Sequence, residues 1–514
     1  MNQLKRDLNR PIKRVSIGVL VLFLILLVNV NYLQAVDATS LANGPQNPRT
    51  EYNDSQVQRG NIVTADGVTI AGTKVANNAS GFKYQRTYSD GPVYAPVTGY
   101  DTIYTPAQAP NYATGVERAE NSLLSGTGDQ LAFRNFIDMI TNKPQKGATV
   151  QVTINSKAQQ AAYSGLQSTL AGHTINGVQQ VGGVVALNPS TGAILAMASY
   201  PSYDPSQLSV PDTTTVNSRL TKLTAANPSP LLNNASQTTL PPGSTFKIVT
   251  TSTLYTNKPA TTPTTPVYSP QPLKLPNGNF LNDDADAPCG NGSGTTQIIV
   301  AFAESCNTPF AQIGMELGGP AINSIAQKYG FNTAVNIPGV STAASNFTPD
   351  SDESLLAYDA IGQHDTTETP LQEAMIAETV ANGGVEMKPY LIQQVTASDL
   401  SVVSQTQPQQ LATPISPAIA ADEKTMMIAV VQDSDGTGFQ FNANAEGGLE
   451  IAGKTGTAQN GTSQSDAVFT AFAPADNPKI AVGVMIQGGG YGAQAAAPIA
   501  VAVIRAYLAA TGQG

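Results

Sequence analysis

This 514-residue chain contains no tryptophan, only two histidines and two cysteines, and few charged residues, at 12%. Neither His173 nor His364 lies in a sequence context that marks a catalytic base, so a serine–histidine mechanism has no support. No cluster of metal ligands is present, and the glycines at 488–490 lack the strand-to-helix context of a phosphate loop. We therefore predict neither a metal nor a cofactor. The net charge of −10 argues against nucleic acid as a partner.

Positive charge is concentrated at the amino terminus. Residues 1–14 carry five basic residues against one acidic residue, a net +4, so the total of −10 leaves −14 for the remainder. The apolar run at 15–33 follows directly and is long enough to span a bilayer. The positive-inside rule then predicts a cytoplasmic tail, a single-pass anchor in the cell membrane, and an extracytoplasmic remainder. A cleaved signal peptide is the alternative, because Ala35 and Ala38 are small residues downstream of the run.

Export gives the two cysteines a meaning. In an oxidising compartment an even pair is usually bridged, which predicts a disulfide between Cys289 and Cys306. The loop-entropy model assigns such a bridge about 3 kcal/mol. Two buried thiols are the alternative interpretation.

Three short segments occur in a fixed order: Ser-Thr-Phe-Lys at 244–247, Ser-Cys-Asn at 305–307, and Lys-Thr-Gly-Thr at 454–457. A serine hydroxyl is a poor nucleophile unless a base and an oxyanion cradle accompany it. If a helix begins at Ser244, Lys247 lies one turn further along the same face and can serve as that base. Burial and the neighbouring cation of Lys454 would lower the pKa of Lys247 and make a neutral amine available.

In this order the three segments resemble the S-x-x-K, S-x-N and K-T-G signature of penicillin-binding proteins and serine β-lactamases. Asn-Pro-Ser-Thr-Gly at 188–192 and Thr-Pro-Leu-Gln at 369–372 also resemble that family. Arg-Gly-Asn-Ile at 59–62 resembles the stretch with which class B amino-terminal domains leave the membrane, although the following Asp-Arg-Asn-Gly is replaced here by 63–67. The resemblance to class B penicillin-binding proteins, the monofunctional peptidoglycan D,D-transpeptidases, covers roughly residues 149–514.

The resemblance implies a role for each motif residue. Ser244 would attack the D-Ala-D-Ala carbonyl and form the acyl-enzyme that β-lactams trap, with Lys247 accepting its proton. Ser305 would relay a proton to the leaving amine, and Asn307 would hold the substrate amide and Lys247. Lys454 would set the positive potential of the pocket.

The last motif would bind substrate. The hydroxyls of Thr455 and Thr457 would hold the terminal carboxylate, and Gly456 would leave room for the substrate strand. Backbone N–H groups of Ser244 and Thr457 would form the oxyanion hole. Implied partners are peptidoglycan stem peptides, β-lactam antibiotics, and a polytopic glycosyltransferase of the shape, elongation, division and sporulation (SEDS) family that makes the nascent glycan.

The expected fold is a membrane-anchored α+β protein. A tail at 1–14 and the anchor at 15–33 precede a smaller, strand-rich pedestal or dimerisation-like domain at 34–148. Residues 149–514 form the penicillin-binding transpeptidase domain, similar to serine β-lactamases, with an antiparallel sheet flanked by helices. About 115 residues between membrane and second domain are fewer than a fused glycosyltransferase requires.

Several local expectations follow from the pattern. Ser156 is expected to cap a helix at 157–170, residues 182–200 to form a hairpin, and Thr369 to cap a helix that ends at 382–383. Strands are expected at 454–456, 466–474 and 480–486, and a packed helix at 498–510.

Two other functions use the same acylation machinery. A membrane-anchored serine β-lactamase needs a group that activates water. Class A enzymes use the glutamate of a Glu-x-x-Leu-Asn stretch, and the nearest match here, at 353–357, lacks the asparagine. Class D enzymes use a carboxylated lysine supported by tryptophan, which this chain does not contain. A β-lactam-sensing receptor usually carries several spans and a cytoplasmic effector. Fourteen residues before one span leave no room for an effector.

Overall fold

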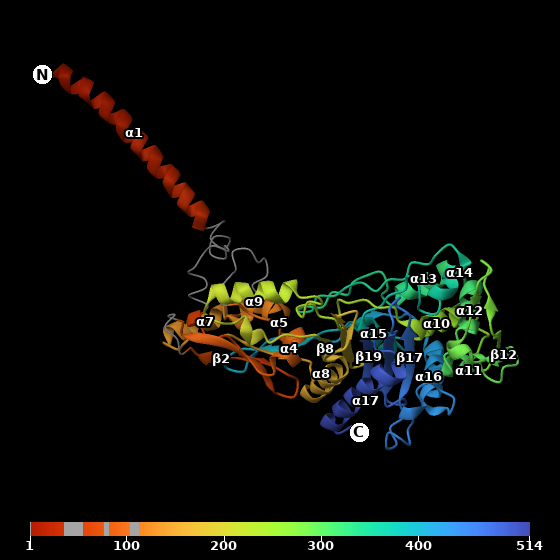
Figure 1. Cartoon of the computed structure of the whole chain (residues 1–514). Helices are drawn as coiled ribbons and strands as arrows, with labels where there is room; N and C mark the ends of the chain where they lie inside the picture. Colours follow the sequence, from red (N-terminus) through yellow and green to blue (C-terminus); the bar gives the residue numbers. More distant parts are fainter. Residues whose placement is uncertain (1, 35–54, 77–81, 103–112, 514) are drawn as a thin grey trace.

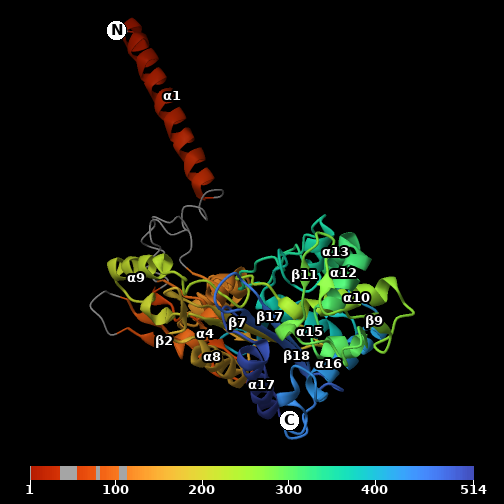
Figure 2. The ribbon, with the colours of Figure 1, turned by 45° about the vertical axis from the view of Figure 1, so that its right-hand side comes forward.

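A long helix precedes the folded body in this computed structural model, which describes residues 2–34, 55–76, 82–102 and 113–513. Helix α1 (Asn2–Tyr32) stands apart from the body in Figures 1 and 2, and the large apolar side chains described from Ile12 onwards are exposed. Its segment Pro11–Tyr32 is long and apolar enough to cross a membrane, which agrees with the expected anchor. The alternative cleavage positions Ala35 and Ala38 lie outside the described residues.

A five-stranded antiparallel sheet forms the centre of the larger part of the molecule, in the order β17-β18-β19-β7-β8. Strands β7 (Gly182–Leu187) and β8 (Ile194–Tyr200) are the predicted hairpin, and β18 (Asp466–Ala473) and β19 (Ile480–Ile486) are buried along their whole length. Strand β17 (Ala452–Ala458) pairs with β18 and occupies one edge of this sheet. The last motif therefore lies at a sheet edge, where a further strand can add.

Helices cover both faces of this sheet. Helices α8 (Ser156–Leu170) and α17 (Gly492–Thr511) pack together against one face, and α15 (Pro370–Ala381) packs against β19 and β7 on the other. Helix α17 is also apolar enough to cross a membrane, but half of it is buried here, and Ile499 meets Gly165 of α8. It is a core helix in this structure.

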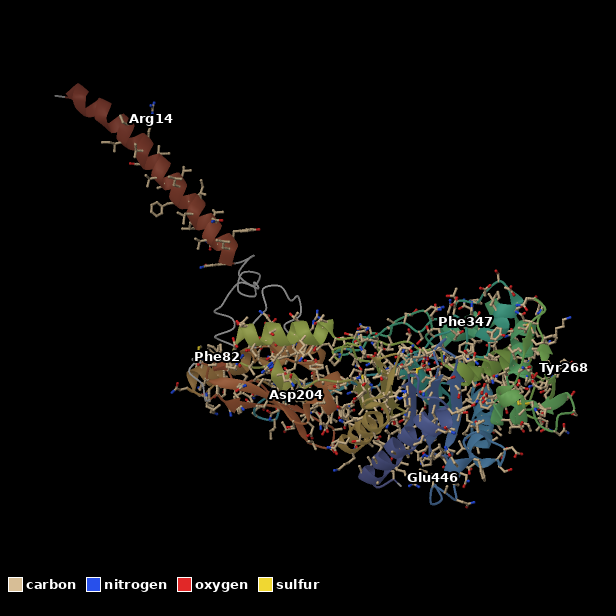
Figure 3. All side chains as sticks on the ribbon, in the orientation of Figure 1. Arg14, Phe82, Asp204, Tyr268, Phe347 and Glu446 are labelled. Atoms are coloured by element: carbon tan, nitrogen blue, oxygen red, sulfur yellow. A yellow bond between two sulfur atoms is a disulfide. The ribbon has the colours of Figure 1, made fainter. Side chains whose placement is uncertain are left out.

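A helical region lies beside β17 and is seen at the right of Figure 1. The helices of this region are α10 (Lys247–Asn257), α11 (Ile298–Ala303), α12 (Thr308–Leu317), α13 (Gly319–Lys328), α14 (Glu353–Asp359) and α16 (Pro417–Gln432). A 3-10 turn, η4 (Gly243–Phe246), leads directly into α10. Phe246 anchors the turn: its ring is fully buried and stacks on Phe347 at 5.1 Å. Figure 3 marks Phe347 in this part of the molecule.

A second sheet of six strands forms the other part, in the order β15-β14-β4-β1-β2-β3. Its strands are β1 (Ile62–Val63), β2 (Thr69–Val75), β3 (Tyr84–Tyr88), β4 (Thr149–Val152), β14 (Ile392–Thr396) and β15 (Val402–Gln405). Its strands come from both sides of the expected boundary at 148/149, since β14 and β15 lie far along the chain. The division into domains at that residue stays a prediction.

An ion-paired cluster holds this part together where the chain enters it. Arg59 pairs with Glu117 at 2.7 Å and with Asp101 at 3.4 Å, and Arg86 pairs with the same buried Glu117 at 2.6 Å. Two cations lower the pKa of Glu117 against the effect of its burial. The arginine of the Arg-Gly-Asn-Ile stretch is therefore a structural residue here.

Three local expectations need correction. Asn155, not Ser156, caps α8, because its carboxamide oxygen accepts from the N–H groups of Lys157 and Ala158, while the Ser156 hydroxyl donates to Asp66 at 2.5 Å. Residues 91–98, expected among strands and hairpins, form helix α4 (Gly91–Thr98). Helix α17 begins before residue 498, with a proline inside it.

Other expectations are confirmed. Thr369 caps α15 by accepting from the Gln372 N–H at 3.1 Å, and the helix ends before Asn382. Two short helices and one longer one, α5 (Gly115–Ala119), α6 (Asn121–Leu124) and α7 (Ala132–Ile140), follow in the first part. The mixed α+β architecture, with a helix-flanked antiparallel sheet and a smaller strand-rich part, is the predicted fold class.

Candidate active site

Ser244 lies in a tight turn pressed against the edge strand of the central sheet. The preceding Gly243 has a φ of +58°, and a Cβ there would meet the carbonyl oxygen of Thr457 at 2.7 Å. Its N–H donates to the carbonyl of Gly362 at 2.8 Å. Only glycine combines this left-handed backbone with so close an approach. The turn η4 therefore presents Ser244 beside β17.

Lys247, at the start of α10, is fully buried and held by one short segment. Its Nζ donates to the carbonyls of Ser305 and Cys306, at 2.7 and 2.8 Å, and to Asn307 Oδ1 at 2.9 Å. The Phe310 ring centroid is 5.3 Å from Nζ. Three acceptors match the three N–H bonds of an ammonium group. Among the described residues no hydrogen bond joins Lys247 to Ser244 Oγ, the contact expected from helical spacing.

Ser305 links the two buried lysines. Its carbonyl accepts from Lys247, and its hydroxyl accepts from Lys454 Nζ at 2.8 Å. The residue has a φ of +62°, a left-handed conformation that is uncommon outside glycine. Strained backbone of this kind clusters at functional sites. This conformation lets one residue contact both lysines from the loop between α11 and α12.

Strand β17 carries the third motif, as expected. Lys454 is fully buried and donates also to the carbonyl of Thr455 at 3.0 Å, and its Nζ is 5.4 Å from the Phe302 ring centroid. Thr455 Oγ1 is 2.6 Å from Thr437 Oγ1, and Thr457 Oγ1 accepts from the Gly492 N–H at 3.4 Å. The hydroxyls of the strand are thus tied to the loop that follows α16 and to the start of α17.

The structure shows a packing reason for Gly456 in addition to the expected one. A Cβ at this position would meet the carbonyl oxygen of Pro242 at 2.4 Å and Thr245 Cγ2 at 3.2 Å. The space above Gly456 is therefore filled by the turn that carries Ser244, and the room that it would leave for a substrate strand stays a prediction. The glycine allows β17 and η4 to pack closely.

A cavity of about 280 Å³ gathers these groups. Motif residues Ser244, Ser305, Asn307, Thr455 and Thr457 line it together. Sequence reasoning missed the other lining residues: Asp284, Glu304, Thr437, Tyr491, Ala493 and Gln494. They come from loops and from the start of α17, and no motif spacing connects them with the three segments.

The pKa of each of the two buried lysines is lowered. Burial, followed by the cation of Lys454, lowers the pKa of Lys247 well below its usual value, while Asp283 and Asp284 oppose the shift. Burial lowers the pKa of Lys454 to about 7, against the opposing effect of Glu373. Because a general base must be unprotonated, a lowered lysine pKa suits the task near neutral pH.

Asp283 fixes residues 305–308, the segment whose oxygen atoms bind Lys247. Its Oδ1 accepts from the N–H groups of Asn307 and Thr308, at 2.6 and 2.8 Å, and its Oδ2 accepts from the Thr308 hydroxyl at 3.1 Å. A carboxylate at the beginning of α12 is also favoured by the positive end of the helix dipole. The acidic stretch at 283–286 was the only sequence signal for this residue, and it did not point to the site.

Cys289 and Cys306 are joined by a disulfide, as predicted, with their Cα atoms 5.8 Å apart. The bond ties the same segment to the loop that follows Asp283. Glu304 and these two sulfurs lie within 4.8 Å of one another. Both sulfurs are used in the disulfide, so this group offers a metal one carboxylate only.

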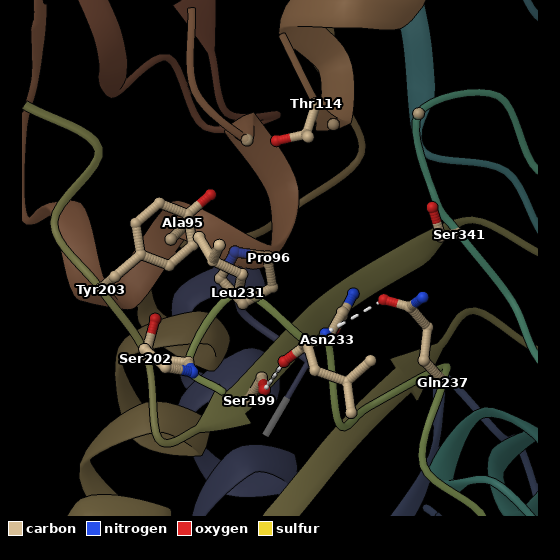
Figure 4. A pocket seen from close by; sticks show the side chains of 15 residues that line it. Ala95, Pro96, Thr114, Ser199, Ser202, Tyr203, Leu231, Asn233, Gln237 and Ser341 are labelled. Atoms are coloured by element: carbon tan, nitrogen blue, oxygen red, sulfur yellow. Dashed lines mark hydrogen bonds between the residues drawn. The ribbon is translucent and has the colours of Figure 1, made fainter. Parts of the chain in front are cut away.

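A second cavity and the two histidines lie outside the cavity that the motif residues line. A second cavity, shown in Figure 4 with Asn233 and Gln237 at its wall, measures only about 90 Å³ and includes none of the motif residues. His364 does have an acidic neighbour, contrary to expectation: its Nδ1 is 3.1 Å from Asp359 Oδ1. His173 contacts the carbonyl of Gly488. Neither histidine lines the cavity at Ser244.

Comparison with known families decides what this arrangement is. Residues 182–505 match the model of the penicillin-binding protein transpeptidase domain, and residues 59–150 match that of the penicillin-binding protein A dimerisation domain. The chain belongs to the penicillin-binding proteins. The first match contains Ser244, Ser305 and Lys454, the leading residues of all three motifs.

Similar proteins narrow the position of this penicillin-binding protein within the family. It is 37% identical to the peptidoglycan D,D-transpeptidase PbpA of Mycolicibacterium smegmatis, over 98% of this chain and 99% of the relative. It is 36% identical to PbpA of Mycobacterium tuberculosis, with the same coverage. It is thus a class B, PbpA-like member.

Solved structures agree with this assignment. The imipenem acyl-enzyme complex of penicillin-binding protein A from M. tuberculosis matches with a TM-score of 0.79 and 35% identity, covering 88% of this chain and all of that one. The penicillin G acyl-enzyme of the same protein matches with a TM-score of 0.78, the same identity and the same coverage.

Proposed function

We propose that this chain is a membrane-anchored peptidoglycan D,D-transpeptidase that cross-links stem peptides through an acyl-enzyme on Ser244. The observation that carries the proposal is the placement of Lys247, buried and bonded to residues 305–307, beside the cavity that Ser244 lines. Membership of a family of serine D,D-transpeptidases supplies the reaction class.

Acylation would proceed through a tetrahedral intermediate. Ser244 Oγ attacks the carbonyl carbon of the penultimate D-Ala and gives its proton to the neutral amine of Lys247. The N–H groups of Ser244 and Thr457 stabilise the oxyanion. When the C–N bond breaks, a proton passes through the Ser305 hydroxyl to the leaving D-Ala amine. Lys247 must first release one of its three observed acceptors, because a neutral amine has two N–H bonds and one lone pair.

Substrate binding would use the edge of the central sheet. A stem peptide lying along β17 places its terminal carboxylate beside the hydroxyls of Thr455 and Thr457, with the cation of Lys454 behind them. Recognition by strand addition supplies main-chain hydrogen bonds at such an edge. An amine of a second stem peptide then attacks the ester, forms the cross-link and frees Ser244.

Topology and partners complete the proposal. The basic residues that precede the apolar run, in the first turns of α1, support an amino terminus in the cytoplasm and a catalytic domain outside. Because cross-linking consumes newly made glycan, a polytopic glycosyltransferase of the SEDS family is the proposed partner. A tail at 1–14, a span at 15–33, an amino-terminal domain at 34–148 and a transpeptidase domain at 149–514 remain the proposed division.

The experiment that tests this function is covalent labelling of the full chain by penicillin, read by intact-protein mass spectrometry. Ser244→Ala is expected to abolish the adduct while the protein stays folded, because only the nucleophilic oxygen is lost. Ser168→Ala, at an exposed serine of α8, is the matched control and keeps the adduct. An adduct that survives on the Ser244 variant places the nucleophile elsewhere. Release of the adduct within seconds indicates a β-lactamase.

A further inference from the structure

Helix α7, in the part of the molecule that contains the six-stranded sheet, exposes its apolar side chains and turns its polar side chains toward the protein. Its five large apolar side chains are exposed, with fractions of 78% for Phe133, 53% for Phe136, 42% for Ile137, 69% for Met139 and 64% for Ile140. Its polar residues 134, 135 and 138 are half-buried. A surface helix of a soluble protein shows the opposite arrangement, with its apolar stripe against the core.

Polar contacts fix this orientation. The side chain of Asn135 donates to the carbonyl of Gly126 at 2.7 Å. Arg134 forms an ion pair with Asp399 and donates to Ser401 Oγ at 3.4 Å. The polar face is therefore fastened to the protein, which directs the apolar face outwards.

A further exposed apolar residue lies in the segment that Arg134 contacts. Leu400, between Asp399 and Ser401 at the turn joining β14 to β15, is 83% exposed and has a φ of +71°. A branched apolar residue in the left-handed region is costly, and such strain persists at sites with a function. Phe133, Phe136, Ile137, Ile140 and Leu400 together are called the α7 patch below.

The α7 patch lies beside the place where the chain enters the folded body. Gln58 pairs with Lys146, shortly after α7, and the Gly147 N–H donates to the Gln58 carbonyl at 2.9 Å. Residues 33–54 join α1 to this entry point and can span at most about 75 Å when extended. The membrane is therefore within reach of the end of the body that carries the patch.

We propose that the α7 patch inserts into the outer surface of the phospholipid bilayer that α1 spans. The proposal rests on that anchoring, which belongs to the proposed function. Apolar side chains of an interfacial helix reach the boundary of headgroups and acyl chains, and Lys143 and Lys146, both exposed, follow at the level of the phosphates.

The size of the patch favours lipid over a second copy of the chain. At the exposed fractions given above, the five side chains of the α7 patch present about 600 Å² of accessible surface, taking about 200 Å² for a whole large apolar side chain. A stable protein interface needs about 800 Å² on each partner. Because α1 already holds the protein at the bilayer, insertion of the patch is an intramolecular event. A small apolar area is then enough for binding.

The test uses the absence of tryptophan from the chain. Full-length Phe136→Trp protein, one chain per nanodisc of phosphatidylcholine and phosphatidylglycerol, has a single reporter. Brominated acyl chains are expected to remove about half of its emission or more, because the indole lies among them. Tyr268→Trp is the matched control: Tyr268 is 59% exposed and lies at the opposite end of the body in Figure 3, so its emission is expected to be unchanged.

Each outcome decides the inference. Adding Phe133→Ser and Ile140→Ser to the Phe136→Trp chain should abolish the quenching while penicillin labelling is retained. Phe136→Trp emission that brominated lipid leaves unchanged overturns the proposal, and a blue-shifted maximum then identifies a protein occupant, either residues 35–54 or another chain. A protein that does not float with lipid vesicles overturns the anchoring by α1 as well. Flotation without quenching overturns the patch alone.

Discussion

Asp283 offers a direct test of how the site is positioned. Its carboxylate is only 6% exposed and holds the N–H groups of Asn307 and Thr308. Through them it orients the segment whose oxygens bind Lys247. Replacing Asp283 by alanine removes the acceptors, while Asp283→Asn keeps one carbonyl oxygen for both N–H groups, removes the charge, and puts an NH2 group opposite the Thr308 hydroxyl, which must then accept where it donated.

The magnitude for Asp283→Ala follows from the groups left behind. Two backbone N–H groups lose their acceptor, and each unpaired buried group costs about 1–3 kcal/mol, so about 2–6 kcal/mol is at stake. The segment will move to recover part of that energy. Because a misplacement of about 1 Å can cost about 100-fold in rate, we expect acylation to fall by about that factor.

Asp283→Asn should behave differently. The anion of Asp283 raises the pKa of Lys247, so its removal lowers that pKa further and leaves more neutral amine at low pH. We expect an acylation rate within about tenfold of wild type and an acid limb of the pH profile that moves to lower pH.

Stopped-flow acylation with a fluorescent penicillin, between pH 4 and 9, measures both effects, and thermal unfolding separates them from loss of fold. Asp286→Asn, at an exposed residue of the same acidic stretch, is the control and should match wild type. Wild-type rates in Asp283→Ala would refute the positioning role. An acid limb of Asp283→Asn that stays in place or moves upwards would refute the electrostatic reasoning.

Three further outcomes are expected. Lys454→Ala removes the cation that lowers the pKa of Lys247, so the acid limb of acylation should move to higher pH, and a downward shift would contradict this. Burial raises the pKa of Glu386 from 4.5 to about 8. The stability that its protonated carboxyl contributes is complete below pH 4.5 and is lost as pH rises to about 8, at about 1.4 kcal/mol per pH unit. Glu386→Gln should therefore flatten the fall of Tm between these pH values, and an unchanged slope would count against the assignment. Paired Cys289→Ala and Cys306→Ala substitutions should slow acylation at a temperature at which the protein stays folded. A lowered Tm with an unchanged acylation rate would show that the bridge serves stability alone.

Most of the candidate site could be read from sequence because its chemistry is encoded locally. The three motifs occupy a 3-10 turn, a helix-to-helix loop and an edge strand, and each has its own short-range pattern. The hairpin at 182–200 and the capped helix at 370–381 were equally predictable, since their turn and cap residues act within a few positions.

Errors arose where two local solutions compete. Asn155 and Ser156 are both good caps, and the choice was made by Asp66, which binds the Ser156 hydroxyl from far away in the sequence. Helix α4 was missed because Asp90-Gly91 indicates a turn, whereas burial of Tyr94 and Val97 stabilises a helix directly after it. Tertiary packing overrides weak propensity in such cases.

The sequence by itself determined the candidate membrane span, the family, the three motifs and the pairing of the only two cysteines, because each depends on residue type and order along the chain. Only the tertiary structure decided that Asp283 orients the Lys247 contacts, that Gly456 makes room for the turn of Ser244, and that β14 and β15 complete the six-stranded sheet. It also decided that the apolar face of α7 points away from the protein. Such facts depend on which distant surfaces meet, and periodicity along one segment carries no information about the surface that will face it.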